Sequence, residues 1–214
     1  MPFVLSEQTS ADETFDEVSK ALHLYAKKNK LLESINMKKI ARCFLLAGEE
    51  NLEEVKQKIA DAAIRAGKKP EDITLVMATK TVDTDRIQEA VRNGGHIIAE
   101  NKIQEALRKY EVLKDEDAEW HFIGHLQTNK VKDVLKFADM IHSVDRMSLV
   151  EKLDKRLMSE SRSMDVLIQV NTSYEESKYG VAPEEAISLL KEASRYDTLK
   201  IKGLMTIGLF TDDE

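Results

Sequence analysis

From residue 51 onward, the sequence alternates between short apolar runs and longer segments with helical periodicity. The apolar runs that we expect to form strands are 73–79, 96–99, 120–124, 139–144, 164–170 and 200–208. The segments expected to be helical are 51–67, 85–94, 102–113 and 128–137, then a helix capped by Asp145 and ending near Ser159, and a helix beginning near Pro183. Strands and helices that alternate at this spacing predict βαβ units and a parallel sheet.

These units contain no Gly-x-Gly-x-x-Gly turn, which favours an α/β barrel over a dinucleotide-binding sheet. In such barrels the functional side chains lie where the strands end and the loops begin. The polar residues at or just beyond the predicted strand ends are Lys80, Asn101, His125, Asp145, Asn171 and Thr206. We therefore expect a site at this end of the barrel.

Composition limits the compartment and the partners. The formal net charge is −7, which argues against the broad basic surface of a nucleic-acid-binding protein. Cys43 is the only cysteine, so no disulfide can form within the chain and a reducing cytoplasm is expected. No apolar run approaches the roughly 20 residues that cross a bilayer, so no membrane association is expected.

The N-terminal part of the chain differs from the rest. Residues 12–35 carry apolar side chains at amphipathic helical spacing. Residues 37–48 include a short apolar stretch that Arg42 interrupts, and we expect a packed helix there rather than a signal segment. We therefore divide the chain into a helical leader, 1–48, and a barrel domain, 49–214. Whether the leader only packs on the domain or binds a partner stays open.

Lys80 is the first candidate for chemistry, because it follows the apolar strand LVMAT. One interpretation is a rim lysine whose stem lies along the strand while its ammonium group reaches water. The other is a Schiff-base lysine, whose partial burial at the barrel mouth favours the neutral amine that attacks an aldehyde. The residues alone leave these two interpretations about even.

The other candidates are weaker. His121 and His125 would lie about 13 Å apart on one strand face, too far for one metal ion. We expect His121 to be structural and His125 to donate hydrogen bonds in a site. The short amide of Asn101 suits a ring hydroxyl or a phosphate, and Asn171 opens a polar loop that could also be an ordinary connection. The sequence shows no catalytic triad order, P-loop or zinc spacing.

Six segments occur in an order and spacing that resemble one family: MATKT, AENKIQEAL, WHFIGHLQTNK, IHSVD, IQVNTSYEESKYGV and GLMTIG. They resemble the pyridoxal 5′-phosphate (PLP) homeostasis proteins, also called the YggS or proline-synthetase co-transcribed family, over roughly residues 50–210. The resemblance implies a TIM-barrel-like domain of the alanine racemase N-terminal type (PLP fold type III). It implies a monomeric carrier and regulator of the cofactor, with no turnover and no catalytic residue.

The resemblance also implies where the cofactor would be held. PLP would form a Schiff base with Lys80, and the residues lining its pocket would be Asn101, His125, Asn171, Met205 and Thr206. Two positions differ from the family pattern, with Ala99 where glycine is usual and Thr79 where serine is common.

A further difference concerns the C-terminal segments of the family. Its MGMS-type and VRIG-type segments, the latter with an arginine for the pyridine nitrogen, do not occur here. We therefore expect about six of the eight βα units. Since the loops after strands 7 and 8 commonly hold the phosphate, we expect weak cofactor binding unless another chain supplies them. The open barrel edges could associate with other chains.

Two alternatives belong to other classes. A PLP-dependent racemase-like enzyme would need a second acid/base residue near the pocket. An interaction protein that has lost the cofactor would use the amphipathic segment 12–35 to bind a partner.

Overall fold

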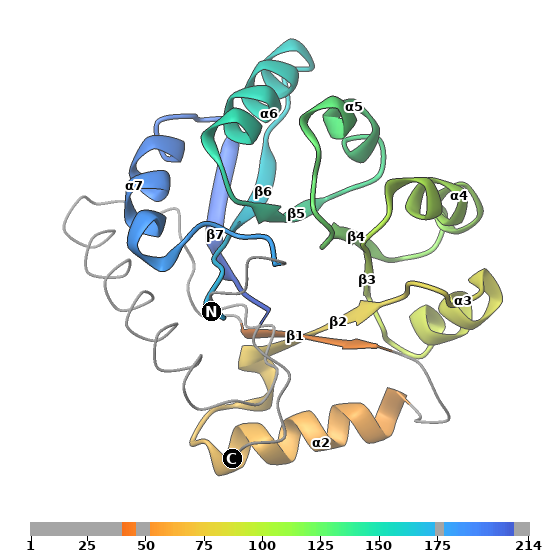
Figure 1. Ribbon diagram of the computed structural model, residues 1–214. Coiled ribbons are helices and arrows are strands. Elements are labelled where there is room, and N and C mark those ends of the chain that lie inside the picture. The colour runs from red at the N-terminus through yellow and green to blue at the C-terminus, as the bar shows by residue number, and fades with distance from the viewer. Residues whose placement is uncertain (1–39, 46–51, 174–177, 208–214) are drawn as a thin grey trace.

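The computed structural model of the chain describes residues 40–45, 52–173 and 178–207. These residues form one curved sheet with helices on its outer side (Figure 1). In the described residues the sheet has seven strands in the order β1-β2-β3-β4-β5-β6-β7, and every neighbouring pair is parallel. The expected α/β, barrel-like architecture is confirmed. The predicted helix over 12–35 lies outside the described residues.

The elements follow the predicted alternation closely. The strands are β1 (Ile40–Leu45), β2 (Ile73–Ala78), β3 (Ile97–Glu100), β4 (Glu119–Phe122), β5 (Met140–Val144), β6 (Met164–Gln169) and β7 (Leu199–Met205). The α-helices are α2 (Leu52–Arg65), α3 (Thr84–Arg92), α4 (Ile103–Leu113), α5 (Val131–Val134), α6 (Met147–Ser159) and α7 (Pro183–Ala193), with short 3₁₀ turns at Pro70–Asp72 and Thr128–Lys130. Strands β1 to β6 are each followed by one of these helices, which confirms about six βα units.

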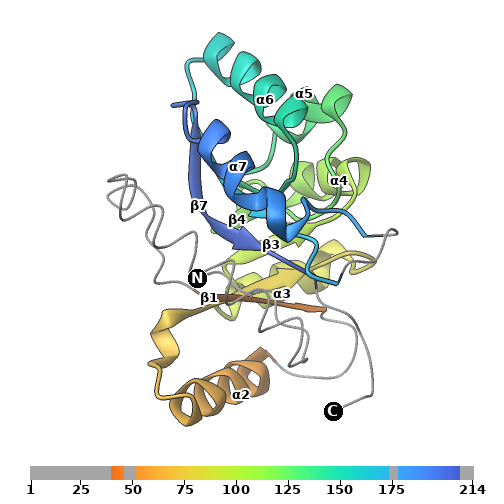
Figure 2. The ribbon, with the colours of Figure 1, turned by 60° about the vertical axis from the view of Figure 1, so that its left-hand side comes forward.

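The helix expected within 37–48 was wrong, because Ile40–Leu45 is the strand β1. It pairs with β2 along its whole length, from Ile40 opposite Ile73 to Leu45 opposite Ala78. A short, mostly apolar segment such as IARCFL cannot be assigned to strand or helix by periodicity alone, and pairing with the edge of β2 decides it here. The sheet therefore begins inside the segment that we had assigned to the helical leader. Figure 2 shows β1 beside β2, with α2 outside both.

Two helix boundaries also differ from the prediction. The segment 128–137 forms a 3₁₀ turn and then only the four-residue helix α5, although its apolar residues Leu135 and Phe137 are buried. Asp145 does not cap α6, because its carboxylate pairs with the guanidinium of Arg146, which occupies the N-cap position.

The main core lies between the sheet and the helices. Trp120 of β4 meets the rings of Tyr110 and Phe137 edge-on, with centroids 5.4 and 6.2 Å away. Phe122, two residues further along β4, also packs against Phe137. Because side chains alternate along a strand, His121 between them faces the barrel interior.

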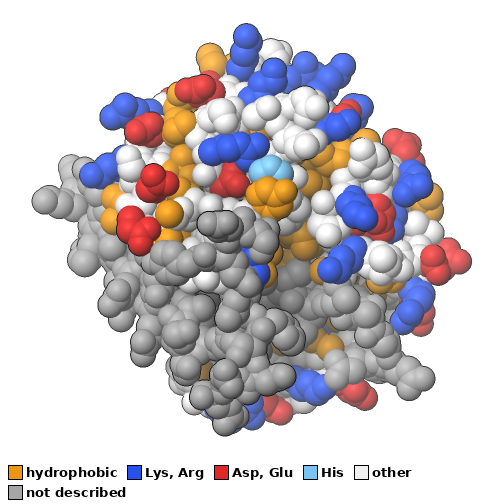
Figure 3. Space-filling view, in the orientation of Figure 1, with side chains coloured by type: hydrophobic (Ala, Val, Ile, Leu, Met, Phe, Trp, Pro, Cys, Tyr) orange, Lys and Arg blue, Asp and Glu red, His pale blue; other side chains and the backbone are white. Residues whose placement is uncertain are grey.

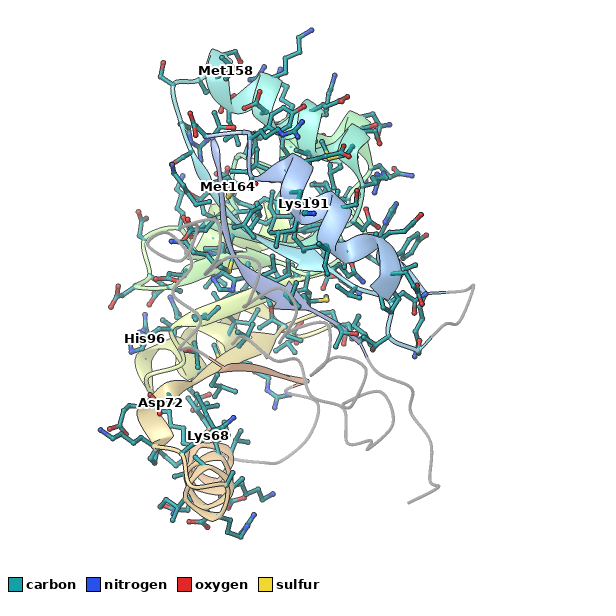
Figure 4. The ribbon with its side chains drawn as sticks, turned by 90° about the vertical axis from the view of Figure 1, so that its left-hand side faces the viewer. Lys68, Asp72, His96, Met158, Met164 and Lys191 are labelled. Atoms are coloured by element: carbon teal, nitrogen blue, oxygen red, sulfur yellow. The ribbon has the colours of Figure 1, made fainter. Side chains whose placement is uncertain are left out.

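The parallel strands give the barrel two chemically different ends. Figure 4 shows Asp72, His96 and Met164, which lie at the starts of β2, β3 and β6, at the same end. The strand ends that carry the candidate residues therefore meet at the opposite end. On the face shown in Figure 3, acidic and basic side chains are interspersed over the helices. Among the described helices, none has the length and apolar character needed to span a membrane.

Candidate functional site

Lys80 and Asn101 follow neighbouring strands at the same level. Ala78 pairs with Ala99 in the sheet, and the N–H of Thr79 donates to the carbonyl of Ala99 over 3.0 Å. Lys80 and Asn101, each two residues beyond that pair, therefore lie side by side. The loop after β4 lies against these residues, because Gly124 packs directly on the backbone of Asn101. A Cβ atom at position 124 would overlap the Asn101 carbonyl. Only glycine permits this approach, which explains the glycine before His125.

Lys80 lies in the turn directly after β2 and is exposed. The expected partial burial of its ammonium group was therefore wrong for this structure. Within the described segments, no hydrogen bond or ion pair holds the Lys80 side chain. The Lys80 side chain is therefore accessible to a ligand at the strand ends.

Asn101 is half-buried, and its side-chain oxygen Oδ1 is buried with no hydrogen-bond partner among the described residues. A buried amide oxygen normally accepts a hydrogen bond, because desolvating it without a partner costs about 1–3 kcal/mol. A ligand with an N–H or O–H group would satisfy this oxygen. This is the observation in the site that most directly indicates a polar ligand.

His125 lies in the loop after β4, since the strand ends at Phe122 rather than at residue 124 as expected. Its ring stacks on Tyr179, with the centroids 3.7 Å apart and the planes at 15°. Burial lowers the pKa of His125, and the positive charge of Arg146 lowers it further, while the Asp145 carboxylate opposes both. The imidazole is therefore neutral near pH 7, and its Nδ1 is buried without a hydrogen bond among the described residues.

A second group of candidates gathers at the ends of β6 and β7. The hydroxyl groups of Thr172 and Thr206 are 2.8 Å apart, and both side chains are buried. The N–H of Val170 donates to the carbonyl of Met205 over 2.8 Å, which fixes the level of these strand ends. The Asn171 amide donates to the carbonyl of Lys178 over 3.3 Å and so closes the loop above them.

Tyr179 connects the two groups, and it was not among the residues predicted from the sequence. It belongs to the loop closed by Asn171, yet its ring lies on His125 from the first group. Its carbonyl accepts the Gln169 amide over 3.1 Å. Gly180, with φ +126°, turns the chain back toward the sheet. The contact depends on this backbone turn, which residue type alone does not predict.

A buried charged network lies beside Lys80. Of its residues, Glu100 follows a predicted strand and is a weak candidate from sequence, whereas Lys109 and Glu105 were not predicted. The ammonium of Lys109 donates to the Thr79 carbonyl and to the carboxylate of Glu100, each over 2.7 Å. It also donates to Glu105 over 2.8 Å, and this hydrogen bond is the main reason why the pKa of Glu105 is lowered. Lys109 and Glu100 are both buried.

His121 does not reach the strand ends. Its Nδ1 lies 2.9 Å from Nε2 of His142 on β5, and both rings are buried inside the barrel. Burial holds the pKa of His142 well below its ordinary value near 6.5, and the neighbouring His121 lowers it further. In the part of the chain that the structure describes, no cluster of His, Cys, Asp and Glu residues could hold a metal ion.

Comparison with known proteins identifies relatives of the whole barrel region. The model of the family described as "Alanine racemase, N-terminal domain" matches residues 45–214. A pyridoxal phosphate homeostasis protein of Aquifex aeolicus is 44% identical over 158 residues, covering 74% of this chain and 69% of that protein. The protein of the same name from Escherichia coli K12 is 38% identical over 160 residues, covering 73% and 68%.

Solved structures agree with this assignment. PipY of Synechococcus elongatus PCC7942, solved with PLP bound, is 31% identical, with a TM-score of 0.60 over 72% of this chain and 73% of that chain. An unknown protein from Bifidobacterium adolescentis is 35% identical, with a TM-score of 0.67 over 75% and 69%. An alanine racemase of Clostridium difficile 630 is 10% identical with a TM-score of 0.53, a likeness of fold alone.

Proposed function

Because this chain belongs to the family of pyridoxal phosphate homeostasis proteins, we propose that it binds PLP and serves intracellular homeostasis of that cofactor. One structural observation indicates which residues would bind the cofactor. The exposed amine of Lys80 lies at the same strand ends as the unsatisfied amide oxygen of Asn101. PLP offers an aldehyde for an amine and polar ring groups for an amide. The PLP-bound structure of PipY, at 31% identity, supports the same ligand.

Lys80 is the residue that we propose to hold the cofactor covalently. Its Nζ would form a C=N bond to the aldehyde carbon, with loss of one water molecule. The amine must be neutral to react, and its exposure leaves it open to proton exchange with water. The link is reversible by hydrolysis, which suits a protein that both takes up and releases a cofactor.

The remaining candidates would line the pocket. Asn101 would accept a hydrogen bond through Oδ1, and the neutral ring of His125 would present Nδ1. Met205 at the end of β7 and Thr206 directly after it would line the other side of the pocket, with Asn171 in the loop above them. The stacked Tyr179 ring would hold the His125 ring in place.

We propose a carrier rather than an enzyme, acting in the cytoplasm as a monomer. The names of the relatives describe homeostasis, not a catalysed reaction. The alanine racemase shares the fold at only 10% identity, which transfers no activity. Amino-acid turnover by the PLP-loaded chain would favour the racemase-like alternative instead.

The test is a titration of the full chain with PLP, monitoring the absorption band of the lysine-bound cofactor. The wild type should develop this band, and Lys80→Ala should not. Lys152→Ala removes an exposed lysine on α6 and serves as the matched control, which should behave as the wild type. An equally strong band in Lys80→Ala would refute the assignment of Lys80.

A further inference from the structure

The turn that carries Lys80 has an unfavourable backbone conformation. Thr81, the next residue, has φ +63°, in the left-handed region. A β-branched residue seldom adopts this conformation, because its side chain crowds the backbone. Such strain persists only where surrounding contacts over-determine it, and it clusters at functional sites. The contacts around this turn therefore indicate what holds it.

On one side of Lys80, the turn is held by helix α4. The N–H of Thr81 donates to Oε1 of Glu105 over 2.9 Å. The same carboxylate oxygen accepts from the Lys109 ammonium over 2.8 Å, one helical turn further along α4. Thr81 is thus hydrogen-bonded to the Glu105 carboxylate, which Lys109 holds in place.

On the other side, the network holds Thr79. Its carbonyl accepts from Lys109, and its hydroxyl donates to Oε1 of Glu100, each over 2.7 Å. Glu100 in turn accepts from Lys109 over 2.7 Å. A lysine ammonium has three N–H donors, and here the Thr79 carbonyl, Glu100 and Glu105 account for all three. Lys109 therefore binds the residue before Lys80 directly and the residue after it through Glu105.

We propose that Lys109, Glu100 and Glu105 form a positioning frame for Lys80, which fixes the backbone on both sides of the cofactor lysine. This rests on the proposed function, in which Lys80 binds PLP. The frame forms no hydrogen bond or ion pair with the Lys80 side chain in the described residues. It holds the backbone of the turn so that this side chain lies at the strand ends beside Asn101. The alternative is a network that only stabilises the packing of α4 on the sheet.

Glu105 is the residue to change, because its side chain is only partly buried and its loss leaves the Lys109–Glu100 pair intact. Glu105→Ala removes the acceptor for the Thr81 N–H, whereas Glu105→Gln keeps an acceptor oxygen at the same place. Glu111→Ala, on the same helix, removes an exposed carboxylate that pairs only with Lys114 in the described structure and is the matched control.

The first measurement needs no cofactor. Hydrogen exchange of the Thr81 amide should be at least about tenfold faster in Glu105→Ala than in the wild type, since its acceptor is lost. Glu111→Ala should exchange at the wild-type rate, and Glu105→Gln close to it. Unchanged exchange in Glu105→Ala would overturn the frame.

The second measurement is the rate at which the Lys80-dependent band forms when PLP is added. A misplaced reacting group can cost up to about a hundredfold in rate, so we expect Glu105→Ala to be about tenfold to a hundredfold slower. Glu105→Gln should restore most of the rate. A network that only packs α4 would instead lower the urea midpoint of Glu105→Ala and leave the rate unchanged, which would overturn the proposal.

The two measurements separate the two proposals. If the wild type forms no Lys80-dependent band, both the proposed function and the role of the frame in cofactor binding are wrong. The exchange of Thr81 still reports whether the frame holds the turn. If the wild type forms the band and Glu105→Ala forms it equally fast, only the frame is refuted.

Discussion

Acidification from pH 7 to pH 5 should destabilise this fold through the buried pair of His121 and His142. Their ring nitrogens are 2.9 Å apart, and Nδ1 of His142 has no hydrogen-bond partner among the described residues. A proton on His142 would place a charge in the barrel interior beside a second imidazole. Burial and this neighbour hold the pKa of His142 well below its ordinary value near 6.5.

The sign of the effect follows from the direction of that pKa shift. In the unfolded chain His142 takes up a proton as the pH falls through about 6.5, while in the folded chain it takes one up only at a lower pH. The stabilisation is therefore complete above pH 6.5 and is lost as the pH falls toward the folded-state pKa. One such group changes the free energy of unfolding by about 1.4 kcal/mol per pH unit at most, which sets an upper limit of about 2 kcal/mol between pH 7 and pH 5.

The assay is urea unfolding, followed by circular dichroism, at pH 7, 6 and 5. His142→Gln removes the titrating ring but keeps a hydrogen-bonding side chain. The wild type should lose more unfolding free energy than this variant between pH 7 and pH 5, by up to about 2 kcal/mol. His96→Gln removes an exposed imidazole and should match the wild type. Equal losses in the wild type and His142→Gln would refute the reasoning.

Three substitutions test other parts of the structure. Trp120→Ala should cost about 3–5 kcal/mol of unfolding free energy, because it empties a buried site among aromatic rings; a loss below about 1 kcal/mol in urea unfolding would contradict this packing. Gly124→Ala should weaken PLP binding and cost about 1–3 kcal/mol, since its Cβ overlaps the Asn101 carbonyl; wild-type binding and stability would disprove that approach. Thr81→Asn should raise the free energy of unfolding by up to about 1 kcal/mol in urea unfolding, because asparagine tolerates a positive φ; a large loss of stability would argue against the left-handed turn.

The strand ends were predictable because two local signals coincide there. A short apolar run such as LVMAT indicates a buried strand, and parallel strands bring all such ends to one side of the barrel. This places Lys80 and Asn101 together before any coordinates are known. Strand β1 was not predictable in this way, since its assignment depends on pairing with β2 rather than on its own pattern.

The sequence contains a signal for the buried lysine of the positioning frame. Lys109 is three residues after Ala106 and four before Leu113, and both of those are buried on α4. A lysine at that helical spacing lies on the buried face and needs carboxylate partners. The exposure of Lys80, by contrast, depends on the turn geometry around Thr81, which the hydrophobic pattern of the sequence does not predict.

The account depends most directly on the lysine that holds the cofactor, and chemical trapping identifies it. The PLP-loaded chain is reduced with borohydride, digested, and mapped by peptide mass spectrometry. Reduction should leave the pyridoxyl group on Lys80 in nearly every molecule, with Lys109 unmodified because its ammonium is buried and fully bonded. A label on another lysine, or no label above that of a denatured chain, would contradict the central claim.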